Sequence, residues 1–355
     1  MPPSPEATFT GLRLFELTRL LGSRTRALAA RKWLFETRPL PLVLPARIPG
    51  VSAWAWEAVL EAAPLPECRV AERQRARDGT TKITLAFGPA AVEAALIPAE
   101  HRSTVCVSSQ AGCTRHCRFC ATATLGFSRQ LTAGEIVLQY AIAKAVAAPA
   151  QPLRNVVFMG MGEPMDNLDA VLRAVEMLTE AGSPGLSREH VTVSTSGVLP
   201  EMERFLRSSP AQLALSLNAT TDEQRERLMP HDRTWPIAAL LGALRDDQAR
   251  GSGRRYFIEY VLWKDLNDAD EDARRLVALL GGLRAHVNLI PHNAFEGNSL
   301  VPPSNERVIA FQKAVHDGGV RCLVRWPRGR EIGAACGQLA LRVAEATPSE
   351  ARRTP

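Results

Sequence analysis

The feature that most limits the fold of this chain is a regular alternation of short apolar runs and amphipathic helical patterns, which begins at residue 104. Short runs rich in Val, Ile and Leu are typical of buried parallel strands, and parallel strands need long crossover connections. The predicted strands are residues 104–108, 155–159, 190–194, 212–217, 255–262 and 286–290, with 321–325 as a further one. Repeated βα units indicate an α/β fold, either a parallel barrel or a doubly wound sheet. Six units are few for a closed eight-stranded barrel, so we predict an open, partial barrel.

The intervening helices carry recognisable start and stop residues. Thr132 and Glu135 have the spacing of a capping box before an apolar helical run. Asn167 and Ser304 each precede a further helical pattern, and Gly182 follows the first of these as a stop signal.

The first hundred residues have a different character. Residues 1–47 carry eight basic and three acidic side chains, which is +5 of the net charge of +6. Residues 8–38 have a helical pattern, four prolines within residues 39–50 predict a turn or linker, and Thr81–Phe87 predicts a strand of a small sheet. The basic helical stripe is either a solvated face or a surface that docks RNA, because Lys and Arg neutralise phosphates.

Composition excludes several protein classes. Apolar residues make up 46% and charged residues 23% of the 355 residues, which excludes global disorder. No apolar stretch approaches the ~20 residues of a membrane span, and the amino terminus lacks a secretory signal, so we expect a cytoplasmic protein. Seven cysteines in such a protein favour metal binding or catalysis over a disulfide framework.

Three of the cysteines crowd into one short segment, Cys113–Cys120, with the spacing C-x3-C-x2-C directly after the first predicted barrel strand. Barrel active sites gather in such loops. A structural zinc site needs four ligands, and His116 would have to be the fourth. An ordinary 4Fe-4S carrier needs a fourth cysteine. Three thiolates would leave one iron open, which is what a catalytic metal site requires.

The triad, with an aromatic residue before its last cysteine, resembles the radical S-adenosylmethionine (SAM) enzymes. Five surrounding blocks narrow the resemblance to the RlmN/Cfr family of radical-SAM RNA adenine methyltransferases. These blocks are residues 106–113, 159–167, 194–198, 288–293 and 334–339. The resemblance implies a partial (β/α)6 radical-SAM barrel with a small, mainly helical N-terminal accessory domain. We expect an accessory, RNA-docking domain at 1–98, the core domain at 99–341 and a disordered tail at 342–355.

The resemblance also implies the cofactors and their ligands. Cys113, Cys117 and Cys120 would hold one 4Fe-4S cluster, and two SAM molecules would be used per turnover. The SAM site would be lined by Gly162, Glu163, Ser194, Ser216, Leu217, Asn218 and Asn293. Asn218 departs from the family pattern, which often has His there, but Asn can also donate a hydrogen bond.

The remaining roles concern three residues. By resemblance Cys336 carries the methyl group, Cys106 later attacks the sulfur of Cys336, and Glu93 accepts the ring proton. Reductive cleavage of the second SAM gives a radical that activates the methyl group, a covalent protein–RNA adduct follows, and its release leaves a transient disulfide. Cys68 and Cys322 match no motif and are expected to be core residues.

The implied activity is methylation of adenosine, at C2 in 23S ribosomal RNA and also transfer RNA, or at C8 as in the Cfr branch. We expect a monomer that receives electrons from a donor such as flavodoxin. Two other readings stay open, another radical-SAM enzyme or a non-catalytic zinc or iron–sulfur RNA-binding module. Cys106 and Cys336 favour the methyltransferase, because the radical-SAM enzymes that make glycyl radicals or insert sulfur do not need them.

Overall fold

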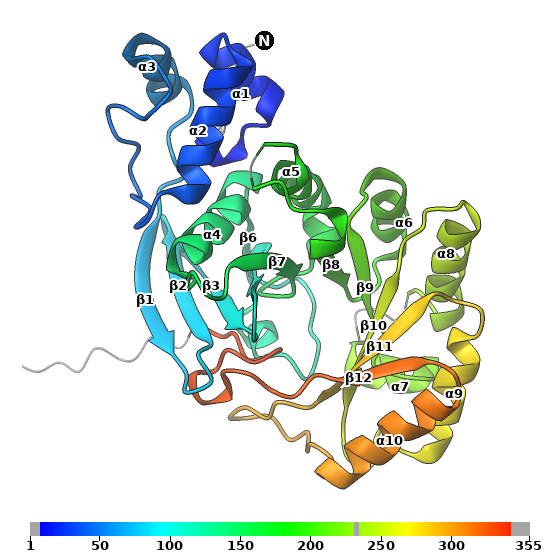
Figure 1. Cartoon of the computed structure of the whole chain (residues 1–355). Helices are drawn as coiled ribbons and strands as arrows, with labels where there is room; N and C mark the ends of the chain where they lie inside the picture. Colours follow the sequence, from blue (N-terminus) through cyan, green and yellow to red (C-terminus); the bar gives the residue numbers. More distant parts are fainter. Residues whose placement is uncertain (1–7, 183, 231–233, 342–355) are drawn as a thin grey trace, which may run out of the picture.

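The computed structural model describes residues 8–182, 184–230 and 234–341, and a single mixed sheet runs through most of this part of the chain (Figure 1). Ten strands pair in the order β1-β2-β3-β4-β7-β8-β9-β10-β11-β12. Their bounds are β1 (Arg69–Arg75), β2 (Thr81–Phe87), β3 (Ala90–Pro98), β4 (Ser103–Cys106), β7 (Leu153–Phe158), β8 (Val191–Thr195), β9 (Gln212–Ser216), β10 (Tyr256–Leu262), β11 (Ala285–Pro291) and β12 (Arg321–Val324).

The partial barrel predicted from the sequence is confirmed. The strands from β4 to β12 in this order are all parallel, and each predicted strand lies within two residues of the observed one. Helices cover the outside of the curved sheet (Figure 1). They are α4 (Ala133–Val146), α5 (Leu168–Thr179), α6 (Leu199–Ser208), α7 (Asp222–Leu228), α8 (Ile237–Ala249), α9 (Asp270–Leu280) and α10 (Asn305–Asp317).

The helix start signals act largely as predicted. The backbone N–H of Glu135 donates to the Thr132 hydroxyl (3.2 Å), and the Glu135 carboxylate accepts from the Thr132 N–H (2.8 Å). Ser304 caps α10 by accepting from the N–H of Arg307. Asn167 does not cap α5, because its Nδ2 donates to the carbonyls of Ser109 and Leu131 instead. It therefore fixes the loop after β4, not the helix.

The helical pattern at residues 8–38 is divided into three pieces. A 3₁₀ helix η1 (Phe9–Gly11) is followed by α1 (Leu14–Leu21) and α2 (Arg24–Glu36), and a further helix α3 (Ala53–Ala62) follows the prolines. Gly22 separates α1 from α2 with a φ of 63°, a left-handed conformation that favours glycine. The rings of Phe9, Trp33 and Trp56 meet at centroid distances of 5.4–6.3 Å and form the centre of this helical unit.

The sheet passes through the expected domain boundary at residue 98. Strands β1 to β3 form an antiparallel ladder, and β3 pairs in turn with β4 of the barrel. Of the described residues before 98, the helices that precede β1 form a separate helical unit beside this sheet (Figure 1). The sequence pattern predicted one strand of a small sheet. No local signal indicates that this small sheet is continuous with the sheet of the barrel.

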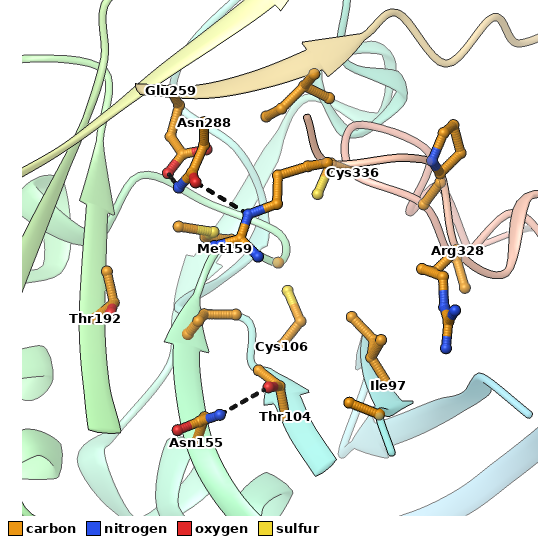
Figure 2. A pocket seen from close by; sticks show the side chains of 18 of the residues that line it. Ile97, Thr104, Cys106, Asn155, Met159, Thr192, Glu259, Asn288, Arg328 and Cys336 are labelled. Carbon is orange, nitrogen blue, oxygen red and sulfur yellow. Dashed lines mark hydrogen bonds between the residues drawn. The ribbon is translucent and has the colours of Figure 1, made fainter. Parts of the chain in front are cut away.

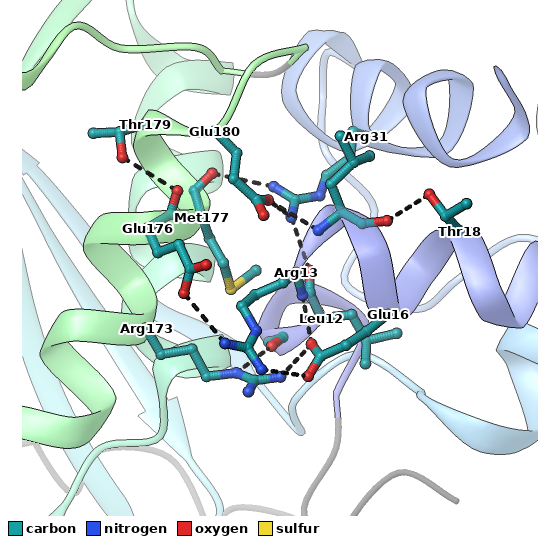
Figure 3. A network of polar contacts seen from close by, with 12 residues as sticks. Leu12, Arg13, Glu16, Thr18, Arg31, Arg173, Glu176, Met177, Thr179 and Glu180 are labelled. Carbon is teal, nitrogen blue, oxygen red and sulfur yellow. Dashed lines mark hydrogen bonds and ion pairs between the residues drawn. The ribbon is translucent and has the colours of Figure 1, made fainter. Parts of the chain in front are cut away.

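One buried and one partly exposed ion pair hold the helical unit against α5 (Figure 3). Arg31 of α2, 2% exposed, pairs with Glu180 (2.8 Å) and also donates to the carbonyls of Leu12 and Met177. Nearby, Arg173 pairs with Glu16 (2.5 Å). Thus Arg31, part of the basic segment seen in the sequence, faces the protein interior and cannot contribute to a solvent-facing surface.

Two further expectations concern the chain as a whole. Within the described ranges, no helix is long and apolar enough to cross a membrane. The tail expected at 342–355 lies outside the described residues.

Replacing Arg31 with Ala should strongly destabilise the protein. Removing the guanidinium leaves Glu180 and two carbonyls without their partner at a buried interface, which costs about 3 kcal/mol. The free energy of unfolding in urea would measure this loss. Lys32→Ala is the matched control, because Lys32 is 71% exposed and its 3.8 Å pair with Glu36 contributes less than about 0.5 kcal/mol. Equal stability of the two variants would show that the Arg31 pair does not hold the interface.

Candidate functional site

The three clustered cysteines lie on one loop beside the carboxyl end of the barrel. Cys113 follows β5 (Gln110–Gly112), which pairs with β6 (Phe127–Gln130), and Cys120 precedes the 3₁₀ helix η2 (Ala121–Leu125). The N–H of Cys113 donates to the carbonyl of Gly126 (2.9 Å), and that of Cys120 donates to Cys117 (3.1 Å). All three side chains are half-buried, and they line one small cavity of about 160 Å³.

The donor set fits an iron–sulfur cluster better than a single metal ion. Among the described residues, no three His, Cys, Asp or Glu side chains are grouped closely enough to hold one metal ion. A cluster with four irons needs only one thiolate at each of three separate irons. His116, the alternative zinc ligand, is exposed. The loop therefore presents three separate thiols toward one cavity, as a cluster with an open iron requires.

Most of the predicted SAM-binding residues line the same small cavity. They are Gly162, Glu163, Ser194, Ser216, Asn218 and Asn293. Gly162 has a φ of 103°, and a Cβ there would lie 2.6 Å from the side chain of Gln110, so only glycine fits this turn. Leu217, the remaining predicted residue, is fully buried and does not line the cavity.

Several polar atoms of this wall form hydrogen bonds with other described residues, whereas Oδ1 of Asn293 and Nε2 of His292 do not. The Glu163 carboxylate accepts from the N–H groups of Met165 (3.0 Å) and Ser196 (2.8 Å), and burial raises the pKa of Glu163 to about 7. Asn218 Oδ1 accepts from Val261 N–H (2.9 Å). The Oδ1 atom of Asn293 is buried and has no hydrogen-bond partner in the described part of the chain. An acceptor left in this state fits a ligand that donates a hydrogen bond.

Arg225, which the sequence analysis missed, fixes the backbone of this wall. It is 2% exposed on α7, and its Nη1 donates to the carbonyls of Ser216 (2.9 Å) and Leu217 (2.8 Å). Its Nη2 donates to the carbonyl of Ser196. One guanidinium thus joins the loops that follow β8 and β9. No sequence pattern identifies it, because the arginine lies in an ordinary polar helix.

Cys106 and Cys336, the two cysteines predicted to be catalytic, both line a second, larger cavity of about 900 Å³ (Figure 2). Cys106 ends β4 and Cys336 lies in the segment after β12, and both thiols extend into the space between these elements (Figure 2). Desolvation raises the pKa of both thiols, that of Cys336 to about 11, although Cys336 keeps an exposed surface while Cys106 is buried. All seven cysteines are free thiols, with Cys322 buried and Cys68 half-buried.

The segment that carries Cys336 is fixed by contacts from several elements. Gly337 accepts from the N–H of Ala121 (2.7 Å), and Leu339 accepts from the Thr122 hydroxyl (2.7 Å). Asn293 Nδ2 donates to the carbonyl of Cys336 itself (3.0 Å). These contacts bring Cys336 next to the cysteine loop, more than two hundred residues away in sequence.

Glu93 does not line either cavity. It is 1% exposed on β3, forms an ion pair with Lys82 (3.0 Å), and accepts from the N–H of Ala340 (3.0 Å). In strand register it lies two residues from Ala95, the pairing partner of Cys106, so both occupy the same sheet face. Its carboxylate currently holds the Cys336 segment, four residues beyond that cysteine.

A further polar array on the wall of the larger cavity was missed in the sequence. Asn288 Nδ2 donates to Glu259 Oε1 (2.7 Å), and Arg325 Nε donates to Asn288 Oδ1 (3.0 Å). Burial raises the pKa of Glu259 to about 7. The sequence does contain a signal for Glu259. It is the one carboxylate within the apolar run Tyr256–Leu262, and burying a charge there costs free energy unless the group has a partner.

Comparison with known proteins agrees with this geometry. The profile of the radical SAM superfamily matches residues 107–277. The chain is 50% identical over 294 residues to a probable RNA methyltransferase of Sorangium cellulosum, covering 82% of this chain and 73% of the relative. It is 41% identical over 362 residues to the dual-specificity RNA methyltransferase RlmN of an Anaeromyxobacter species, covering 99% of this chain and 94% of the relative.

The fold of this chain also resembles that of a solved methyltransferase. The crystal structure of a radical SAM methyltransferase from Sphaerobacter thermophilus superimposes with a TM-score of 0.85 at 36% identity, covering 94% of this chain and 99% of that one. The radical SAM match implies that SAM and a 4Fe-4S cluster are the cofactors. The sites described above provide a place for each.

Replacing Arg225 with Ala should weaken SAM binding by about tenfold, because three buried carbonyls of the small cavity lose their donor. Equilibrium dialysis of labelled SAM against the anaerobically reconstituted protein would measure the dissociation constant. Arg227→Ala is the control, since Arg227 is exposed on the same helix. If both variants bind SAM as the unmodified protein does, Arg225 does not position the site.

Proposed function

Because this chain belongs to the RlmN/Cfr family of radical-SAM RNA methyltransferases, we propose that it methylates C2 of adenosine in 23S ribosomal RNA and in transfer RNA. The names of the relatives support this choice, since they are dual-specificity RNA methyltransferases of the RlmN type. Methylation at C8, the Cfr-type reaction, is the alternative outcome of the experiment below. C2 and C8 are poor nucleophiles, so the methyl group must be activated as a radical.

The observation that carries the proposal is how the two reactive thiols are distributed between the cavities. Cys336 borders both the small cavity beside the cysteine loop and the large one, whereas Cys106 borders only the large one. A thiol that takes a methyl group from SAM and then delivers it to RNA must reach both spaces. Cys336 therefore suits the S-methylcysteine carrier, and Cys106 suits the thiol that later attacks its sulfur and forms a transient disulfide.

The cofactors have clear positions in this scheme. Cys113, Cys117 and Cys120 would hold the cluster, and the small-cavity residues named above would bind SAM, with Leu217 contributing only backbone. When bound, the cluster and SAM supply the electron and the carbon radical that the reaction needs, with two SAM molecules consumed per turnover. The free Oδ1 of Asn293 would accept a hydrogen bond from SAM, while its Nδ2 holds Cys336 in place.

Glu93 is the proposed acceptor of the ring proton. Its Oε1 atom forms an ion pair with the Lys82 ammonium, which lies 3.0 Å away and is 5% exposed. To reach a base in the large cavity, Glu93 would have to release the N–H of Ala340. The same carboxylate would then act first as an anchor for the Cys336 segment and later as a base.

The accessory region 1–98 is proposed to dock the RNA. Exposed basic side chains support this role on two of its parts. The helical unit presents Arg19, Arg24, Lys32, Arg38 and Arg47, and the edge strand β1 presents Arg69, Arg73 and Arg75. Cationic side chains of this kind neutralise phosphates without reading sequence. An external electron donor such as flavodoxin, a cytoplasmic location and a monomeric state complete the proposal.

Mass spectrometry of nucleosides tests the activity directly. RNA from cells lacking the modification, incubated with the reconstituted enzyme, should gain 2-methyladenosine. Cys336→Ala should abolish the product while SAM binding survives, and Cys106→Ala should accumulate a protein–RNA adduct that migrates as a retarded band in a denaturing gel. Finding 8-methyladenosine would assign the Cfr-type reaction, and full activity of Cys336→Ala would reject the scheme.

Removing the exposed arginines should weaken RNA binding through electrostatics. Replacing Arg69, Arg73 and Arg75 together with Gln should raise the dissociation constant about tenfold and reduce the slope of log K against log salt by about two. A second triple variant at Arg19, Arg24 and Arg47 tests the helical unit in the same way. The control removes Arg274, Arg307 and Lys313 from α9 and α10. If neither set differs from the control, region 1–98 does not dock RNA.

A further inference from the structure

Three polar side chains from neighbouring strands form a linked array on the wall of the larger cavity. Glu259 of β10 stands directly opposite Asn288 of β11 in the parallel register, and Arg325 follows β12. Asn288 joins the other two through its amide, accepting from Arg325 Nε (3.0 Å) and donating to Glu259 Oε1 (2.7 Å) (Figure 2). The proposed reaction scheme uses none of the three.

The array has unused hydrogen-bonding capacity. Glu259 and Asn288 are 6% and 5% exposed, whereas Arg325 is an exposed residue. Within the described ranges, Oε2 of Glu259 and the two terminal nitrogens of Arg325 have no hydrogen-bond partner. All three residues line the cavity that contains Cys106 and Cys336. The carboxylate offers an acceptor and the guanidinium, oriented through its Nε, offers donors, so the array suits a ligand with the complementary pair of groups.

We propose that Glu259 and Arg325, joined by Asn288, read the Watson–Crick edge of the target adenine. Glu259 Oε2 accepts from the N6 amino group, and the Arg325 guanidinium donates to N1. This inference rests on the proposed function, because it takes adenine as the reacting base. Enzymes that modify an unstacked base commonly recognise it by hydrogen bonds to this edge.

The pairing also explains discrimination between the purines. Guanine in the same orientation would place its O6 against the carboxylate of Glu259 and its N1–H against the guanidinium of Arg325. Both contacts would be repulsive, since an acceptor faces an acceptor and a donor faces a donor. N1 of adenine is bonded to C2, so recognition of this edge also fixes the position of the carbon that receives the methyl group.

Binding measurements with modified bases test the inference without requiring turnover. The probe is a fluorescent oligouridylate with one central adenosine, titrated with holoenzyme saturated with S-adenosylhomocysteine. Purine riboside at the centre removes the N6 amino group, and 1-deazaadenosine removes N1. Each should raise the dissociation constant about tenfold for the unmodified protein, whereas 7-deazaadenosine should not. A penalty on 7-deazaadenosine alone, or none at all, would overturn the proposal.

Variants assign each contact to its residue. The penalty for purine riboside should disappear in Glu259→Leu, and that for 1-deazaadenosine should disappear in Arg325→Met, as a double-mutant cycle requires. Arg328→Met is the matched control, because Arg328 lines the same cavity but pairs with Asp78 (3.4 Å), and it should keep both penalties. Unchanged penalties in the two test variants would overturn the proposal.

Two further measurements separate recognition of the target base from binding of SAM, and from the methylation activity itself. Dialysis of labelled SAM against the variants shows whether the array holds the adenine of SAM; lost SAM affinity with unchanged RNA penalties would overturn the inference. The nucleoside analysis above tests the activity independently. Absence of methylated adenosine with the binding pattern intact would reject the proposed function alone. Methylation by an enzyme that shows no penalties would reject the base-reading pair alone.

Discussion

The return of the C-terminal segment onto the cysteine loop determines where Cys336 lies relative to the two cavities. Backbone and side-chain hydrogen bonds join Gly337 to Ala121 and Leu339 to Thr122. Because hydrogen bonds are short and directional, they fix Cys336 at the border of both cavities with little freedom. Cys336 thereby shares its position at the border of the two cavities with Cys120 of the cysteine loop, whereas Cys106 borders the large cavity alone.

The parallel order of the strands explains why the other residues of the small cavity lie close together. The carboxyl ends of β7 to β11 lie at one end of the barrel, so Glu163, Ser194, Ser216 and Asn293 meet although they are far apart in sequence. Arg225 joins two neighbouring loops, because its one buried side chain donates to three of their carbonyls. The geometry of the small cavity is therefore set by the scaffold and needs little adjustment by a ligand.

The sequence allowed accurate prediction of those features whose signal is local. The strands are continuous apolar runs, and the three cysteines that line one cavity lie within eight residues of sequence. Contacts between segments that are far apart in the sequence could not be predicted in this way, because no local pattern marks them. The pair Arg31–Glu180 joins residues 149 apart, and it turns an apparently solvated arginine into an interface residue. The array around Asn288 depends on strand register, which apolar runs do not specify. Cys336 could be singled out only through family resemblance.

The incomplete barrel explains why a cavity of about 900 Å³ exists at all. The interior of a closed eight-stranded barrel is filled by its own side chains. Here the sheet does not close, and its two sides are bridged by side chains instead. Arg328, after β12, donates to the carbonyl of Pro98 (2.8 Å) and pairs with Asp78 in the turn after β1. Closure by side chains leaves space between β4 and the C-terminal segment for a nucleotide base. The same bridge ties the two ends of the sheet together, so the open barrel gains room for substrate while the wall that carries Cys106 stays close to Cys336.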